Sequence, residues 1–177
     1  LRITPTASAE TIADGLVTVG NPCLSGGSLD IFLEAVLPPK LVYVFGDAPV
    51  ARALVKVGKS LGHEVRQVAS SVDAPVDLTA LIVASHGHDE TELLLAALHA
   101  DVPYIALVAS PRRGRAVLDS LDITDDARQR VHTPAGLDIG ARTPSEIALS
   151  IYAELLALHP TIAIEHQPAD HSHCHPA

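Results

Sequence analysis

The sequence has no Trp and no Met, and its 177 residues include only two Phe and three Tyr. A hydrophobic core must therefore be aliphatic, drawn from the 47% of residues that are hydrophobic. No uninterrupted apolar run reaches the roughly 18 residues that a membrane-spanning helix needs, and no basic, apolar signal segment opens the chain. Only two cysteines occur, so a disulfide framework is not expected. We expect a cytoplasmic protein with no membrane anchor.

Positive charge is also scarce, because 12 Lys and Arg stand against 21 Asp and Glu, with a formal net charge of -9. Binding to nucleic acid depends largely on Lys and Arg side chains that neutralise phosphates, so this balance argues against a nucleic-acid partner. Arg112, Arg113 and Arg115 form one local basic cluster on the otherwise acidic chain.

From residue 39 onward, short apolar runs alternate with segments that carry helix start and stop signals. Strands separated by helices of this length must be parallel, with right-handed crossovers. The pattern predicts an α/β fold with a doubly wound, mostly parallel, Rossmann-like sheet. The expected strands are Leu41–Phe45, Glu64–Val68, Leu81–Ala84 and Tyr104–Val108, and the expected helices are Pro49–Leu61, Glu90–His99 and Pro111–Leu121.

The best-marked element is a further helix that starts after Thr143. Thr143 and Glu146 form a capping box, with Pro144 at the first helical position. One apolar stripe then continues down the helix towards Pro160. Its members are Ile147, Ile151, Leu155 and Leu158.

Three segments are expected along the chain. Residues 1–38 form an amino-terminal segment with a small β element, including a strand over Leu29–Glu34, where polar and apolar residues alternate. Residues 39–160 form the Rossmann-like domain. Residues 161–177 are polar and His-rich and are expected to be a flexible tail.

Ligands of open parallel sheets bind outside the carboxyl ends of the strands, so the residues that follow each strand are the candidate site. The first turn is Gly46-x-Ala48-x-x-Ala51, and Ala48 stands where a second glycine would admit a pyrophosphate. No carboxylate ends the following strand to bind a ribose hydroxyl, and Asp73 lies too far along. NAD binding in the standard mode is therefore disfavoured, and a turn needed only for packing is the alternative.

The Leu81–Ala84 strand is followed by Ser85, His86, Gly87, His88 and Asp89. Two imidazoles one residue apart at a strand end could bind an anion, relay a proton or hold a metal. In the alternative interpretation, Asp89 caps the next helix and the histidines are solvated.

Two further loops add candidate ligand-binding residues. Ser110 is a helix cap that places Arg112 and Arg113 at a helix N-terminus, where basic residues oppose the helix dipole unless an anion lies among them. These groups predict a phosphate or carboxylate site. Gly136 and Asp138 lie in a Gly-rich loop whose backbone can approach a ligand closely, with a structural lead-in to the last helix as the alternative.

Three motifs together carry a family resemblance: NPCLSGGSLDIFLE at residues 21–34, SHGHD at 85–89 and PAGLDIGARTPSEIA at 134–148. From about Asn21 to Leu158, the chain resembles the xanthine dehydrogenase accessory proteins (XdhC/CoxF-like), chiefly their carboxyl-terminal Rossmann-like half. The resemblance implies a maturation factor, a chaperone more than an enzyme. Such a factor binds molybdenum cofactor, protects it during sulfuration and delivers it to a xanthine or carbon monoxide dehydrogenase. The implied partners are the apo-hydroxylase and a cysteine desulfurase, and a homodimer is left open.

The chain departs from the family pattern in two places. Ala48 in the first turn, and Ala69 and Ser70 after the second strand, replace a glycine and an acid that members often carry. The domain that usually precedes the Cys-Leu-Ser-Gly-Gly segment is almost absent. We therefore expect a fragment or a short member of the family.

The implied cofactor is a pterin with a phosphate arm, and an anion site at Arg112 and Arg113 would suit that arm. Cys23 is a candidate thiolate near the cofactor, with core packing as the alternative. An NAD(P)-dependent oxidoreductase and a metal-binding module remain alternative functions, the latter resting on the tail alone. The tail's candidate ligands for zinc, nickel or copper are His171, His173, Cys174 and His175.

Overall fold

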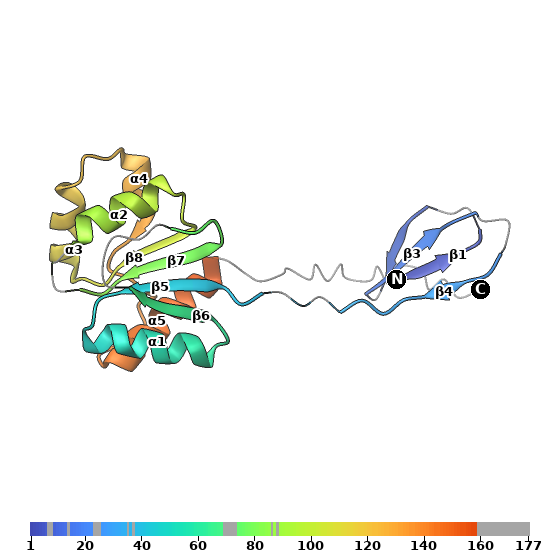
Figure 1. Cartoon of the computed structure of the whole chain (residues 1–177), viewed down its shortest axis with the longest axis horizontal. Coiled ribbons are helices and arrows are strands. Elements are labelled where there is room, and N and C mark those ends of the chain that lie inside the picture. Colours follow the sequence, from blue (N-terminus) through green and yellow to red (C-terminus); the bar gives the residue numbers. More distant parts are fainter. Residues whose placement is uncertain are drawn as a thin grey trace, which may run out of the picture. The chain divides into compact units, whose positions relative to one another are not determined.

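The computed structural model describes residues 1–6, 9–13, 15–22, 26–34, 36, 38–68, 74–85, 87 and 89–158. The chain divides into two compact units, Leu1–Pro38 and Pro39–Ala177. Each unit has its own sheet, and Figure 1 labels most of their strands and helices.

The first unit contains a small mixed sheet with the strand order β2-β3-β1-β4. β1 and β3 are parallel, whereas β2 and β4 run antiparallel to their neighbours. The strands are β1 (Arg2–Thr4), β2 (Thr11–Ala13), β3 (Leu16–Gly20) and β4 (Leu29–Asp30).

The strand predicted over Leu29–Glu34 is too long. β4 ends at Asp30, because its pairing with β1 reaches only as far as the hydrogen bond from the Ile31 N–H to the Leu1 carbonyl. Phe32 and Leu33 beyond it are 90% and 71% exposed. Alternation of polar and apolar residues therefore did not correspond to a strand with one buried face.

The second unit is built on a five-stranded sheet with the order β6-β5-β7-β8-β9, and every neighbouring pair is parallel. The doubly wound, mostly parallel sheet predicted from the sequence is confirmed. Its strands are β5 (Leu41–Phe45), β6 (Glu64–Val68), β7 (Leu78–Val83), β8 (Tyr104–Leu107) and β9 (Val131–His132). Its helices are α1 (Pro49–Ser60), α2 (Glu90–His99), α3 (Pro111–Asp119), α4 (Asp125–Gln129) and α5 (Pro144–Leu158).

Helices cover both faces of this sheet. α1 and α5 lie on one face, and α2, α3 and α4 lie on the other (Figure 1). The alternation of side chains along β5 accounts for the two layers. Leu41, Tyr43 and Phe45 pack with α2 and α3 on one face. Val42 and Val44 pack with α1 and α5 on the other face. Because β5 is buried on both faces, its sequence is a continuous apolar run.

The layer of α1 and α5 depends on one close contact. Gly58 of α1 leaves room for the ring of Tyr152, which is fully buried and donates a hydrogen bond from Oη to the Leu54 carbonyl at 3.0 Å. Burial raises the pKa of the Tyr152 hydroxyl. The ring of His63 stacks on Tyr152 with 5.5 Å between ring centroids.

The last helix begins as the sequence predicts. Glu146 Oε2 accepts from the Thr143 N–H at 2.9 Å, and the Glu146 N–H donates to Thr143 Oγ1 at 3.3 Å, which completes the capping box. The N–H groups of Thr143 and Arg142 both donate to the Glu146 carboxylate and hold its pKa below the ordinary value, since they stabilise the ionised form. Leu158, predicted in the apolar stripe, is 49% exposed, and Tyr152 occupies the buried face instead.

The two edge strands of the five-stranded sheet differ in kind. β6 carries the exposed ion pair between Arg66 and Glu64, with 2.8 Å from Nε to Oε1. β9 is only two residues long. Within the described part of the chain, no helix is long and apolar enough to cross a membrane.

Candidate functional site

The strand order places a switch point between β5 and β7. The chain leaves β5 towards β6 on one side, and returns to β7 on the other, so the connections at the carboxyl ends diverge there. Gly46 follows β5 with a φ of +110°, and a Cβ at this position would lie 2.4 Å from the Ala84 carbonyl oxygen at the end of β7. Gly46 thus lets two strand ends approach each other, which supports the packing role as well as a place at the site.

The first turn of α1 also lies at this switch point. Its N-cap residue Ala48 offers no side-chain hydrogen bond to the first backbone N–H groups of the helix. Arg52 donates from Nη1 to the carbonyl of Asp47 in the same turn. Arg52 was not among the residues predicted from the sequence, although its position one turn into a helix that follows the first strand was a usable signal.

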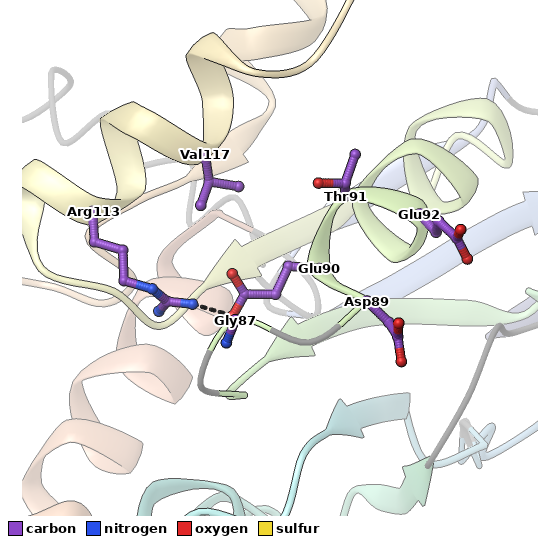
Figure 2. A pocket seen from close by; sticks show the side chains of 7 residues that line it. All are labelled: Gly87, Asp89, Glu90, Thr91, Glu92, Arg113 and Val117. Atoms are coloured by element: carbon purple, nitrogen blue, oxygen red, sulfur yellow. Dashed lines mark hydrogen bonds and ion pairs between the residues drawn. The ribbon is translucent and has the colours of Figure 1, made fainter.

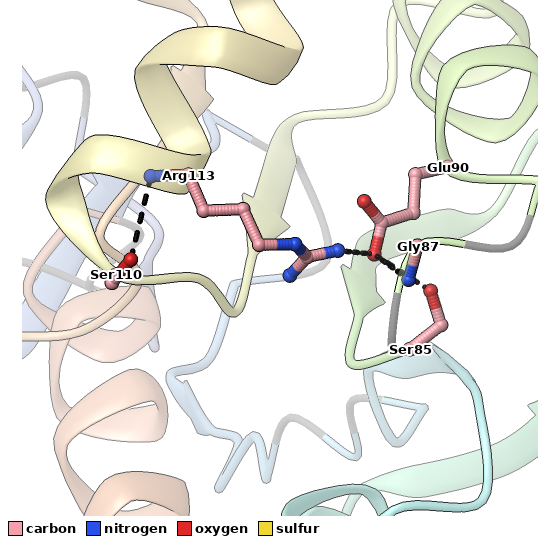
Figure 3. A network of polar contacts seen from close by, with 5 residues as sticks. All are labelled: Ser85, Gly87, Glu90, Ser110 and Arg113. Atoms are coloured by element: carbon pink, nitrogen blue, oxygen red, sulfur yellow. Dashed lines mark hydrogen bonds and ion pairs between the residues drawn. The ribbon is translucent and has the colours of Figure 1, made fainter.

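A buried carboxylate joins the loops that follow β7 and β8. Glu90, the first residue of α2, is 5% exposed. Its Oε1 accepts hydrogen bonds from Ser85 Oγ at 2.7 Å, from the Gly87 N–H at 3.2 Å and from Arg113 Nη2 (Figure 3). Glu90 was not among the site residues predicted from the sequence, so its pairing with Arg113 is a feature that only the structure shows.

Asp89 occupies the N-cap position of α2, but its side chain makes no capping hydrogen bond. Its φ of +56° places it in the left-handed region, which Asp and Asn enter more readily than most residues. The structure therefore does not support the interpretation in which the Asp89 side chain caps the helix. Its neighbours His86 and His88 lie outside the described residues, as does Cys23.

At the start of α3, Ser110 is the cap that the sequence predicts. Its Oγ accepts from the Arg113 N–H at 3.3 Å. Arg113 then turns towards α2, whereas Arg112 is exposed and has no ion pair with any described residue. The two arginines therefore differ, because only Arg113 has an internal partner.

A cleft of about 320 Å³ lies between the starts of α2 and α3 (Figure 2). Among the described residues, its lining includes three carboxylates and the guanidinium of Arg113, whose formal charges add up to -2. A Val117 side chain adds an apolar surface. The described residues that line it are Gly87, Asp89, Glu90, Thr91, Glu92, Arg113 and Val117.

The Gly-rich loop before α5 is attached to that helix. A Cβ on Gly136, whose φ is +94°, would lie 2.4 Å from Ser150 Oγ, and the Leu137 N–H donates to the Ser150 carbonyl at 3.2 Å. These contacts favour the structural interpretation of Gly136. Asp138, two residues further on, is exposed.

A partly buried carboxylate, that of Glu154, anchors the same loop. Glu154 Oε2 accepts from the Gly136 N–H at 2.9 Å and from Tyr104 Oη at 2.6 Å, and Oε1 lies 3.3 Å from His132 Nδ1. The rings of Tyr104 and His132 stack at 4.9 Å. Burial and the bond to Glu154 raise the pKa of the Tyr104 hydroxyl. An acid between the buried Ile151 and Leu155 was the sequence signal for this group.

No group of three or more His, Cys, Asp or Glu among the described residues could hold a metal ion. The four predicted tail ligands, His171, His173, Cys174 and His175, lie outside that part of the chain.

The sheet order and the loops at its carboxyl edge define a doubly wound, Rossmann-like α/β domain. Residues 42–155, more than half of the chain, match the family model described as the XdhC Rossmann domain. The chain therefore belongs to the XdhC family. The matched residues include all five strands of the larger sheet, except Leu41 at the start of β5. They also include the loops that follow β5, β7 and β8 and the loop before α5.

Two relatives are informative. The uncharacterized protein YqeB of Escherichia coli K12 is 27% identical over 172 residues, which cover 81% of this chain and 31% of YqeB. A crystal structure described as a xanthine dehydrogenase from Bacillus halodurans has a TM-score of 0.57 and 23% identity, and the match covers 68% of this chain and 44% of that one. This likeness supports the fold. The present chain spans less than half the length of both relatives.

Proposed function

We propose that this chain belongs to an accessory factor that matures a molybdenum hydroxylase of the xanthine or carbon monoxide dehydrogenase type. In this proposal it binds molybdenum cofactor for sulfuration and insertion, and its partners are the apo-hydroxylase and a cysteine desulfurase. The observation that carries the proposal is the match of residues 42–155 to the XdhC Rossmann domain. The role is that of a non-catalytic chaperone, and neither nucleic acid nor membrane takes part.

The switch point between β5 and β7 offers a place for the phosphate arm of this cofactor. The first N–H groups of α1 have no side-chain cap at Ala48, and helix N-termini of this kind bind phosphate groups. Arg52 lies in the same turn. Arg112 supplies an exposed guanidinium at the start of α3, beyond the carboxyl end of β8. Arg113 is paired with Glu90, so its guanidinium is less suited to the phosphate than the sequence suggested.

The remaining cofactor contacts in this proposal come from the loops that follow β5, β7 and β8 and from the loop before α5. The cofactor supplies the redox-active metal centre of the hydroxylase that receives it. This chain's part is to bind the pterin and to exclude water from it until transfer. The described residues proposed to contact the cofactor are Gly46, Ser85, Gly87, Asp89, Ser110, Arg112, Arg113, Gly136 and Asp138. His86, His88 and Cys23 stay candidates from the sequence, outside the described residues.

Recovery of bound pterin tests the proposal directly. The chain is expressed in cells that make molybdenum cofactor and in cells that do not, and pterin released from the purified protein is measured by fluorescence after oxidation. We expect pterin only in the first preparation. An absence of pterin from both would contradict the proposed cofactor.

Two variants refine this measurement. Arg52→Ala and Arg112→Ala should each weaken cofactor binding roughly tenfold or more, as expected for the loss of a charge-assisted hydrogen bond. Arg130→Ala is the matched control, because Arg130 pairs with Asp101 at 2.9 Å just before β8, at the opposite edge of the sheet. Equal pterin occupancy in all three variants would contradict the proposed position of the phosphate arm at the switch point.

A further inference from the structure

Glu90 is the one charged side chain that is buried among the described residues; Ser150 is the other buried polar residue. Burial of an ionised carboxylate is costly unless charged and hydrogen-bonding partners compensate it. Three donors meet a single oxygen of Glu90: the hydroxyl of Ser85, the N–H of Gly87 and the guanidinium of Arg113. The negative charge is therefore stabilised at a defined position between two loops.

This donor set is the kind that binds a ligand anion. It combines a hydroxyl, a loop N–H and a guanidinium at the start of α2, beyond the carboxyl end of β7. The helix dipole adds to it, because a negative charge is favourable at a helix N-terminus. Glu90 comes from the same loop and helix, so the anion position is filled by the chain itself (Figure 3).

The occupied position changes the charge that a ligand meets. Arg113 is neutralised by Glu90, and the rest of the cleft wall offers the exposed carboxylates of Asp89 and Glu92 (Figure 2). An incoming phosphate would compete with Glu90 for Arg113 and would be repelled by the two other carboxylates. A neutral group with N–H donors would instead donate hydrogen bonds to those carboxylates. It would be neither repelled by them nor in competition with Glu90 for Arg113.

We infer that Glu90 is a specificity-determining residue, whose carboxylate stands in for a ligand anion at Arg113 and so excludes phosphate from this cleft. The cleft then selects an uncharged ligand edge that carries N–H groups, such as an amino-substituted heterocycle. The inference rests on the proposed function for the ligand itself: the pterin end would enter this cleft, and the phosphate arm would lie at the first turn of α1.

Inorganic phosphate and acetate test the role of Glu90 without the cofactor. The Nε–H signal of Arg113 is followed by NMR in ¹⁵N-labelled protein, and thermal unfolding is followed at constant ionic strength. In the parent chain, neither probe should shift the Arg113 signal. In Glu90→Ala and Glu90→Gln, phosphate should shift it, with an affinity on the order of tenfold or more above the parent. Acetate should also raise the unfolding temperature of Glu90→Ala.

Two controls separate this role from a general loss of negative charge. Glu92→Gln removes an exposed carboxylate of the same cleft and should leave the phosphate affinity of Arg113 within a few-fold of the parent. Glu90→Ala combined with Arg113→Ala should lose the gained affinity. Glu90→Gln retains the shape of the side chain, so it provides the comparison if Glu90→Ala does not fold.

The inference is overturned if phosphate shifts the Arg113 signal equally in the parent chain, or if neither Glu90 variant gains affinity. It is also overturned if Glu92→Gln gains as much affinity as Glu90→Gln. Failure of the cofactor-recovery experiment together with a gain in the Glu90 variants would contradict the proposed function alone. Recovered pterin together with no gain would contradict the role of Glu90 alone.

Discussion

Replacing Gly58 by Ala adds a single methyl group at the contact between α1 and α5. That Cβ would lie 2.1 Å from Tyr152 Oη and 2.6 Å from Val65 Cγ2, both well inside van der Waals contact. Tyr152 is fully buried and cannot move outward without disturbing the layer, and its hydroxyl would have to leave the Leu54 carbonyl. We expect the substitution to destabilise the domain.

The magnitude follows from three contributions. Forcing a methyl group into a packed core costs about 1–3 kcal/mol. Loss of the Tyr152 hydrogen bond costs about 0.5–1.5 kcal/mol. Ala favours a helix interior over Gly by up to about 1 kcal/mol, which offsets part of this cost. With each contribution taken near the middle of its range, the unfolding free energy should fall by about 2–3 kcal/mol.

Urea unfolding followed by circular dichroism measures this change as a lower midpoint with an unchanged slope. Lys59→Ala, at the next and exposed position of α1, is the control and should change stability little. Gly58→Ala combined with Tyr152→Phe should recover part of the loss, since the closest atom is removed. A Gly58→Ala variant as stable as the parent would refute the reasoning.

Three further outcomes are expected. Gly136→Ala should lower the unfolding free energy by about 2–4 kcal/mol, because its Cβ would clash with Ser150 and its backbone has a positive φ. Gly140→Ala also places a Cβ at a positive φ but has no atom near it, so this variant measures the backbone strain without the clash. The pKa of His63 is lowered by burial and by Lys40, so the unfolded chain binds a proton that the folded chain resists. Stability should then fall as the pH drops below 6.5, and the slope of that fall should decrease in His63→Phe, whereas an unchanged slope would exclude His63 as its source. Calorimetry with NAD should give no low-micromolar binding, because Ala48 occupies the position in the first turn where a glycine would admit the pyrophosphate. Tight binding would favour an oxidoreductase.

Elements with local signals could be predicted from the sequence. The run Leu41–Phe45 and the cap at Thr143 each depend on neighbouring residues, and both appear where expected. The prediction of a strand over Leu29–Glu34 was wrong beyond Asp30. Alternation of polar and apolar residues does not by itself provide a partner strand. A local pattern predicts the conformation of a segment, and tertiary pairing decides where the strand ends.

The polar contacts within the site were harder to predict. Ser110 was identified as a cap from its own loop, but Glu90 looked like an ordinary acid in the first turn of a helix. Its partner Arg113 lies 23 residues away in sequence. The strand order β7-β8 makes the two loops neighbours, and that order is a property of the whole sheet. The contact of Glu154 with Tyr104, 50 residues apart, was missed for the same reason.

The two borders of the five-stranded sheet limit how this domain can associate with other proteins. Unpaired strands invite strand addition and aggregation, and charged side chains or very short strands discourage both. β6 carries the Arg66 and Glu64 charges along one border, and β9 offers only two residues at the other. A protein that binds this domain is therefore expected to contact its loops or helices, and not to add a strand to the five-stranded sheet.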